Sequence, residues 1–97
     1  MNEMLINKLS NIAQDYPVIQ SILLFGSRAH GDHTDLSDID LAVQAPGLSK
    51  IEWLQLTDRM ERELDTLLKL DLVLYTKASK PLQEQIDQCN KILYKKT

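Results

Sequence analysis

Two aspartates that stand two residues apart, Asp38 and Asp40, are the residues of this sequence whose types and spacing best fit catalytic chemistry. They belong to the alternating segment DIDLAVQ, residues 38–44, which is typical of a β-strand. Side chains at positions i and i+2 of a strand point to the same face, about 6 to 7 Å apart. Two carboxylates at that spacing can share divalent cations, and such oxygen ligands suit Mg²⁺. A bare Asp-x-Asp is more often the solvent face of a strand, so the surrounding sequence must decide.

A glycine and a serine precede this pair, because Gly26 and Ser27 are followed by ten residues and then by Asp-Ile-Asp. A glycine at the end of an apolar run lets backbone amides approach an anion that a side chain would keep away. Ser27 adds a hydroxyl donor and Arg28 adds a cation. We therefore expect Gly26, Ser27 and Arg28 to bind the phosphates of a nucleotide, although Gly26 alone would more often be an ordinary turn residue.

The segment GSRAHG, residues 26–31, has the glycine spacing of a P-loop without its chemistry. A P-loop continues with Lys and Ser or Thr, whereas this chain continues with Asp32 and His33. The acid would repel phosphate, which excludes a P-loop. His30, His33 and Asp35 are a weak pattern for a transition-metal site, and we do not expect one because no fourth ligand is apparent.

A third acid, Asp71, stands inside the apolar segment LDLVLY, residues 70–75. This segment predicts another strand, in which an ionised carboxylate is costly unless it meets a cation or hydrogen-bond donors. The alternative is an edge strand with Asp71 facing water. Since two other acids already favour a cation, we expect Asp71 to join Asp38 and Asp40 as a metal ligand and catalytic residue.

The elements that must position these residues follow from the apolar patterns and the turn signals. They predict an α/β (α+β) fold with a small sheet packed with helices, and the link after Gly26 has room for a single helical turn. The expected helices cover residues 2–15 and about 50–69 and begin again near 79–81, and the expected strands cover 18–25, 38–44, 70–75 and, at an edge, 91–96.

The long helix over residues 50–69 is expected to bury one apolar stripe and to expose a charged face that includes Asp65. Trp53 and Leu56 lie off that stripe, so Trp53 is either partly buried or exposed for a partner. The stripe itself consists of Ile51, Leu54, Met60, Leu64, Leu67 and Leu68.

The length and charge of the chain restrict its class. A chain of 97 residues predicts one domain, residues 1–97. The net charge of −3 argues against nucleic-acid or membrane partners, and it is local: residues 28–40 hold four acids and one base, and the remaining ten acids and ten bases balance. The lone Cys89 and the absence of an apolar run of about 18 residues predict a cytoplasmic protein that is neither exported nor anchored.

The segment GSRAHGDHTDLSDIDLAV, residues 26–43, resembles the signature of the DNA polymerase β-type nucleotidyltransferase superfamily. The short chain resembles its minimal nucleotidyltransferase (MNT) branch, the antitoxins that are paired with HEPN-domain toxins. The resemblance extends over nearly the whole chain, is strongest in residues 22–43, and is supported by Asp71 and the final KILYKK. It implies the polymerase β-like nucleotidyltransferase fold, a small mixed sheet packed with helices.

The resemblance also implies an activity and the roles of the site residues. Nucleotidyltransferases of this kind move a nucleoside monophosphate from a nucleoside triphosphate to an acceptor hydroxyl, release pyrophosphate, and use two-metal catalysis with Mg²⁺. Asp38 and Asp40 would bind the metals, and Asp71 would hold the metal nearer the acceptor and help deprotonate its hydroxyl. Gly26 and Ser27 would hold the β and γ phosphates. His30 stands where members of the family often have Arg, which leaves the motif intact but puts any role of position 30 in doubt.

The MNT branch further implies the acceptor, a cognate HEPN RNase toxin that is inactivated by transfer of AMP from ATP to a tyrosine. The expected protein is therefore the antitoxin of a type VII-like toxin–antitoxin module, a protein adenylyltransferase whose partners are ATP and the toxin. Two alternatives stay open. The protein could neutralise its toxin by steric binding without catalysis, or it could be a nucleotidyltransferase that modifies a small molecule such as an aminoglycoside.

Overall fold

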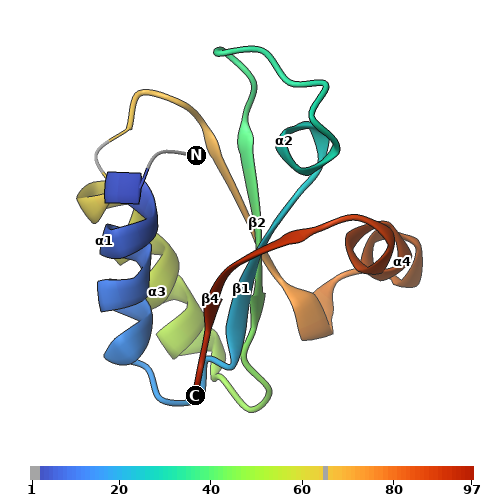
Figure 1. Ribbon diagram of the computed structural model, residues 1–97. Coiled ribbons are helices and arrows are strands. Elements are labelled where there is room, and N and C mark those ends of the chain that lie inside the picture. The colour runs from blue at the N-terminus through green and yellow to red at the C-terminus, as the bar shows by residue number, and fades with distance from the viewer. Residues whose placement is uncertain (1–2, 65) are drawn as a thin grey trace.

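The computed structural model describes residues 3–64 and 66–97, which form a small mixed α/β structure (Figure 1). Its sheet has the strand order β3-β2-β1-β4, in which β2 and β3 are parallel and the other two pairs are antiparallel. The predicted fold class is therefore confirmed. The elements in chain order are α1 (Glu3–Gln14), β1 (Ser21–Phe25), α2 (Ser27–His30), β2 (Ile39–Gln44), α3 (Lys50–Glu63), β3 (Leu70–Leu74), the 3₁₀ turn η1 (Tyr75–Lys77), α4 (Lys80–Gln88) and β4 (Lys91–Lys95).

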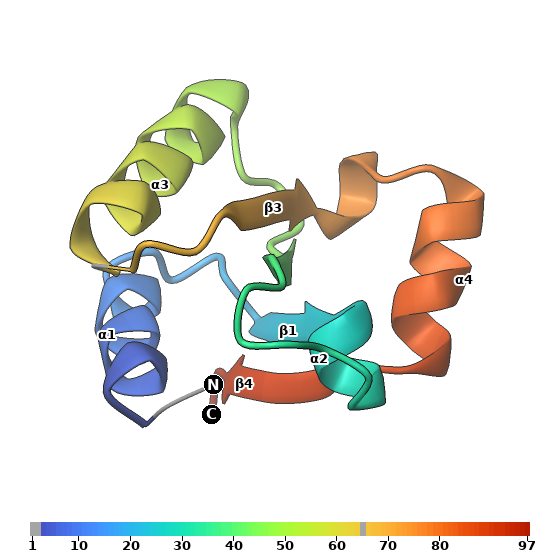
Figure 2. The ribbon, with the colours of Figure 1, turned by 90° about the horizontal axis from the view of Figure 1, so that it is seen from above.

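Helices cover both faces of the sheet, with α1 and α3 on one side and α2 and α4 on the other (Figures 1 and 2). The alternation predicted for β2 is confirmed, because its odd-numbered apolar residues, from Ile39 to Val43, belong to the larger core under α1 and α3. Ala42 belongs instead to a smaller core with Leu23, Phe25 and Ile86 of α4. Asp40 shares the alternate face of β2 with Ala42, which directs its carboxyl group toward the α2 and α4 side.

The central strand β1 is buried on both faces, as its continuous apolar run predicts. It begins at Ser21, three residues later than predicted, because Ile19 lies in the turn that follows α1 and is buried there without strand pairing. The predicted edge strand at the C-terminal end is confirmed as β4, which pairs with β1. Across the described ranges 3–64 and 66–97, none of the helices is both long and apolar enough to cross a membrane.

The long helix α3 begins as predicted but ends at Glu63, six residues early. Its capping box is formed by Ser49 and Glu52, which exchange hydrogen bonds of 3.1 and 3.2 Å. The early end has a topological reason, since Lys69 O must accept the hydrogen bond of Ile39 N (2.9 Å) where β3 starts alongside β2. A helix that continued to residue 69 would leave no residues to connect its end to the start of β3 at Leu70.

The buried stripe predicted for this helix is correct only in part, for Met60, Leu64 and the partly buried Leu68. Leu56, Met60 and Leu64 are the fully buried side chains, and half-buried Trp53 continues their i, i+3, i+7, i+11 spacing. Leu56 and Trp53 are the two residues that we placed off the stripe. Three members of the predicted stripe, Ile51, Leu54 and Leu67, are exposed, and Asp65, predicted for the charged face, lies outside the described residues.

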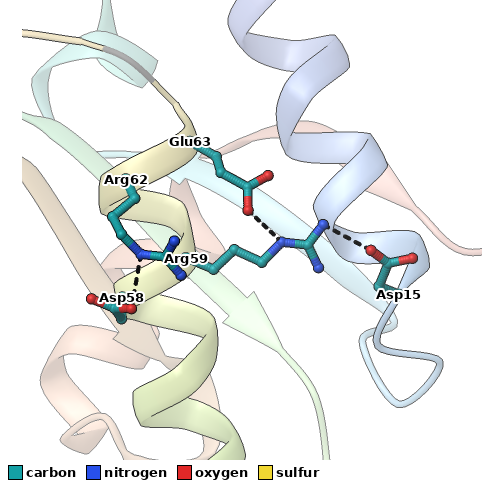
Figure 3. Close-up of polar contacts among 5 residues, drawn as sticks. All are labelled: Asp15, Asp58, Arg59, Arg62 and Glu63. Atoms are coloured by element: carbon teal, nitrogen blue, oxygen red, sulfur yellow. Dashed lines mark hydrogen bonds and ion pairs between the residues drawn. The ribbon is translucent and has the colours of Figure 1, made fainter.

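An ion-pair network joins the two helices of the larger core (Figure 3). Arg59 of α3 contacts Asp15, just after α1, and Glu63 on its own helix, both at 2.8 Å. Hydrogen bonds to Asp15 and then Glu63 raise the pKa of the Arg59 guanidinium above its ordinary value. A second pair, Asp58 with Arg62 at 3.0 Å, lies within α3. The network fixes α1 against α3 on the face opposite to α2 and α4.

Candidate active site

Parallel pairing of β2 and β3 places Asp40 beside Asp71. The two residues are direct partners in the strand register, so their side chains lie next to each other. The alternative interpretation of Asp71 is confirmed, because the residue is exposed on the edge strand β3. That Asp71 is a metal ligand and catalytic residue stays a prediction.

The electrostatics of this pair are unfavourable to a second negative charge. Burial raises the pKa of the Asp40 carboxyl, and the charge of Asp71, the hydrogen bond to Asp71 and the charge of Asp38 raise it further. The positive charge of Lys69 acts in the opposite direction and lowers this pKa. Asp38 precedes β2 and is exposed. A cation bound among these carboxylates would reduce the repulsion between them.

Gly26 lies directly against Asp40, because the antiparallel register pairs Phe25, the residue before Gly26, with Asp40. The backbone of Gly26 has φ 73° and ψ −153°, a conformation that is essentially restricted to glycine. A Cβ atom at this position would clash with Oδ2 of Asp40 and would lie 3.1 Å from its Cγ. The structure therefore favours glycine here for two reasons, its backbone conformation and the close approach of the Asp40 side chain.

The predicted helical turn after Gly26 is confirmed as α2, which has four residues. The amides of Ala29 and His30 donate to Gly26 O at 3.1 Å, whereas those of Ser27 and Arg28 come too early in the helix to have an intrahelical acceptor. The His30 ring also bonds Gly26 O, with Nδ1 as the donor at 3.0 Å. Ser27 and its amide thus stand at the end of β1, next to the Gly26 and Asp40 contact.

Arg28 has a structural role that the sequence did not predict. Its guanidinium donates to the carbonyl of Ser37 at 3.0 and 3.3 Å and to those of Thr34 and Asp35 at 3.5 Å. These bonds close the loop that leads from α2 to Asp38. The predicted binding of phosphate by Arg28 stays a prediction.

The chemistry of the three acids fits Mg²⁺, because Asp38, Asp40 and Asp71 offer only carboxylate oxygens and repel one another around Asp40. Over residues 3–64 and 66–97, however, no group of three or more His, Cys, Asp or Glu side chains is assembled in a form that could hold a metal ion. The structure brings Asp40 and Asp71 together, while Asp38 is linked to them by charge alone. Metal binding by this triad stays a prediction.

A cavity of about 310 Å³ adjoins Asp40 between α2 and α4. Gln85 and Gln88 of α4 belong to its lining, and we did not predict them as site residues. Their spacing of three residues on a helix indicated a shared face. Nothing local in the sequence indicated that this face would lie near Gly26. The cavity is lined by Phe25, Gly26, His30, Asp40, Gln85 and Gln88.

A larger cavity of about 580 Å³ lies away from the acids, between the start of α3 and the strand β3. Its lining is mainly apolar, and it includes no residue that we predicted for the site. It does include Trp53, so the half-buried indole forms part of a surface groove. The lining residues are Leu48, Lys50, Trp53, Leu72, Val73, Leu74, Lys77 and Ala78.

Comparison with known proteins gives the family. Residues 7–97 match the family described as "Polymerase beta, Nucleotidyltransferase". A protein of Methanocaldococcus jannaschii, named as a candidate protein adenylyltransferase, is 38% identical over 74 residues, which are 71% of this chain and 70% of that protein.

Solved toxin–antitoxin complexes have the same fold. A complex with AMP-PNP matches with a TM-score of 0.74 and 34% identity, over 95% of this chain and 74% of the matched chain. The complex of a tri-AMPylated Shewanella oneidensis HEPN toxin with its MNT antitoxin matches with a TM-score of 0.73 and 32% identity, over 99% and 74%. These matches and the fold confirm the resemblance that residues 26–43 carry. The chain belongs to the polymerase β nucleotidyltransferase family.

Proposed function

We propose that this protein is the antitoxin of a HEPN/MNT module and that it transfers AMP from ATP to a tyrosine of its HEPN toxin, with release of pyrophosphate. The observation that carries the proposal is the in-register pair of Asp40 and Asp71 beside the Gly26 turn. The similar solved structures support it, since one contains AMP-PNP and another contains an AMPylated toxin. Others carry two Asp→Glu changes at positions two apart, or a Tyr→Ala change.

The roles of the residues follow from their places in the sheet. Gly26 and Ser27 follow β1 and would bind the terminal phosphates through backbone amides and the serine hydroxyl. Asp38, Asp40 and Asp71 would hold Mg²⁺, which when bound neutralises charge on the phosphates and acidifies the attacking hydroxyl. Since Asp71 is exposed on the edge strand β3, a macromolecular acceptor can reach this side of the site without displacing any strand.

The transfer itself is an in-line displacement. The oxygen of the acceptor hydroxyl forms a bond to the α-phosphorus, and the bond from that phosphorus to the oxygen bridging the α and β phosphates breaks. The proton of the hydroxyl passes to the Asp71 carboxylate, and pyrophosphate leaves with the bridging oxygen. The protein contributes mainly the orientation of the two reactants and the placement of the proton acceptor.

The direct test is transfer of label to the partner. The purified protein, Mg²⁺ and ATP labelled at the α-phosphate are mixed with the HEPN protein encoded by the adjacent gene. We expect labelled toxin, and we expect Asp40→Asn and Asp71→Asn to reduce the labelling rate by about 100-fold or more. The matched control is Asp58→Asn, which removes an exposed acid of α3 and should change nothing. A toxin that the wild-type protein leaves unlabelled contradicts the proposal.

The two alternatives predict different results in the same experiments. A steric antitoxin neutralises its toxin equally well when Asp38 and Asp40 are both replaced by Asn, whereas the proposed enzyme then loses neutralisation but keeps binding. A small-molecule nucleotidyltransferase labels an aminoglycoside in place of the toxin.

Three further expectations from the sequence stay predictions. They are a single domain over 1–97, a cytoplasmic location suggested by the lone Cys89, and the lack of nucleic-acid or membrane partners.

A further inference from the structure

We propose that the cavity between α2 and α4 binds the ribose of the nucleotide, and that Gln85 and Gln88 form hydrogen bonds to the ribose hydroxyl groups. The proposal rests on the proposed function, because it takes the α-phosphate of a nucleoside triphosphate to lie at Asp40. It adds the residues that select the sugar.

The position of the cavity favours the ribose over the rest of the nucleotide. Its wall includes both Asp40 and Gly26, so it adjoins one acid of the candidate site and the turn that would bind the phosphates. In a nucleoside triphosphate, the ribose is joined to the α-phosphorus through the 5′ oxygen, so the ribose is the first group beyond the reacting atom. A volume of about 310 Å³ is at the small end of ligand sites in proteins and suits a sugar and its immediate substituents.

The polar side chains of α4 differ in whether they form hydrogen bonds within the described part of the protein. Gln83 Nε2 donates to Tyr75 O at 2.7 Å, and Asp87 accepts from the Tyr75 hydroxyl at 2.8 and 2.9 Å. These bonds attach α4 to the turn η1. Gln85 and Gln88 are exposed, and within the described part of the chain their carboxamides have no hydrogen-bond partner. Each carboxamide offers two N–H donors and a carbonyl acceptor, the complement of a pair of hydroxyl groups.

The charge of the cavity argues against a phosphate in it. Beyond Asp40, where the α-phosphate is taken to lie, the lining offers no Lys or Arg to a further phosphate group. Hydroxyl groups carry no charge and can donate to acceptors. The His30 ring, whose Nδ1 donates to Gly26 O, is a further polar group of the lining.

The experiment measures equilibrium binding, so that it does not depend on transfer. Affinities of the full chain with Mg²⁺ for ATP, 2′,3′-dideoxy-ATP and GTP are measured by titration calorimetry. We expect Gln85→Ala and Gln88→Ala each to weaken ATP binding about 5-fold, and we expect the double variant to weaken it about 25-fold. Dideoxy-ATP should bind the wild-type protein weakly and the double variant equally weakly, with the ratio of ATP to GTP affinity unchanged. Gln55→Ala, an exposed glutamine of α3 on the opposite side, is the control and should bind all three as the wild type does.

Several outcomes overturn the inference. An unchanged ATP affinity in the double variant removes both glutamines from the site. Equal loss for ATP and dideoxy-ATP, or a changed ratio of ATP to GTP, assigns the cavity to another part of the nucleotide. Labelling of the toxin at saturating ATP is scored separately. Ribose discrimination without toxin labelling leaves the inference intact and contradicts the proposed function, whereas absence of nucleotide binding by the wild type overturns both.

Discussion

Asp40 and Asp71 are direct partners on the parallel strands β2 and β3, and the negative charge of Asp71 helps to raise the pKa of Asp40. The two residues are 31 positions apart in the sequence, and only the pairing of these strands brings them together. Neighbouring like charges on adjacent strands are destabilising, so the metal-free protein retains an unfavourable contact at its candidate active site. A cation removes that cost.

The first prediction is that Asp40→Asn stabilises the metal-free protein. Loss of one charge should raise the free energy of unfolding by up to about 1 kcal/mol and Tm by roughly 4 to 8 °C at neutral pH. The pKa of Asp40 is raised in the folded state, so the folded protein binds this proton more tightly than the unfolded chain does. The ionised carboxylate therefore costs stability above the folded-state pKa, and the cost disappears as the pH falls to the ordinary Asp value.

Thermal unfolding in EDTA from neutral pH down to about 4 checks this sign. The difference in Tm between Asp40→Asn and the wild type should shrink as the pH falls. Addition of Mg²⁺ should raise Tm of the wild-type protein more than that of the variant. A variant that is less stable than the wild type at neutral pH would show that Asp40 makes a net favourable contact.

The second prediction concerns Gly26. Gly26→Ala combines a backbone conformation that alanine rarely adopts with a clash against Asp40 Oδ2, and it should lower the free energy of unfolding by about 3 kcal/mol. Gly47→Ala is the matched control, because Gly47 has φ 87° and nothing within 4 Å of an added Cβ. The control should lose only the backbone contribution, about 1 to 2 kcal/mol. Equal losses in urea-induced unfolding would argue that the Gly26 and Asp40 contact relaxes freely.

The third prediction separates two roles of Arg28. If its guanidinium serves mainly to close the loop before Asp38, Arg28→Met should speed amide hydrogen exchange at residues 34–38 and leave nucleotide affinity within about 3-fold of the wild type. If Arg28 binds phosphate, as the sequence predicts, the affinity should fall by about 10-fold or more. Arg62→Met, an exposed arginine paired within α3, is the control.

The fourth prediction places the Arg59 network outside the chemistry. Arg59→Met breaks the contacts to Asp15 and Glu63 and should lower Tm modestly, with a difference that diminishes as salt is added, because exposed ion pairs are screened. The rate of toxin labelling per folded molecule should stay at the wild-type value, because the network lies on the α1 and α3 face (Figure 3). A loss of labelling without a loss of folded protein would contradict this assignment.

Much of the fold could be predicted because it depends on local periodicity. The continuous apolar run before Gly26 and the Ser49 and Glu52 capping box are confirmed, and the strand predicted over residues 38–44 is confirmed over Ile39–Gln44, with Asp38 just before it. The predicted stripe of α3 was correct only in part, because apolar residues stand on more than one face of that helix. Only the packing against α1 and the sheet decides that Leu56 is buried while Ile51 and Leu54 are exposed.

The sequence by itself determined the chemical groups of this protein: a glycine-serine turn, two acids one strand repeat apart, and a third acid in an apolar segment. Those are properties of neighbours along the chain, so spacing is enough to find them. Tertiary structure alone decided that Asp71 meets Asp40 in register, that Arg28 closes a loop, and that Gln85 and Gln88 line a cavity with Asp40. These contacts join segments far apart in sequence, and they exist because the sheet order and the position of α4 minimise the exposed apolar surface of the whole chain.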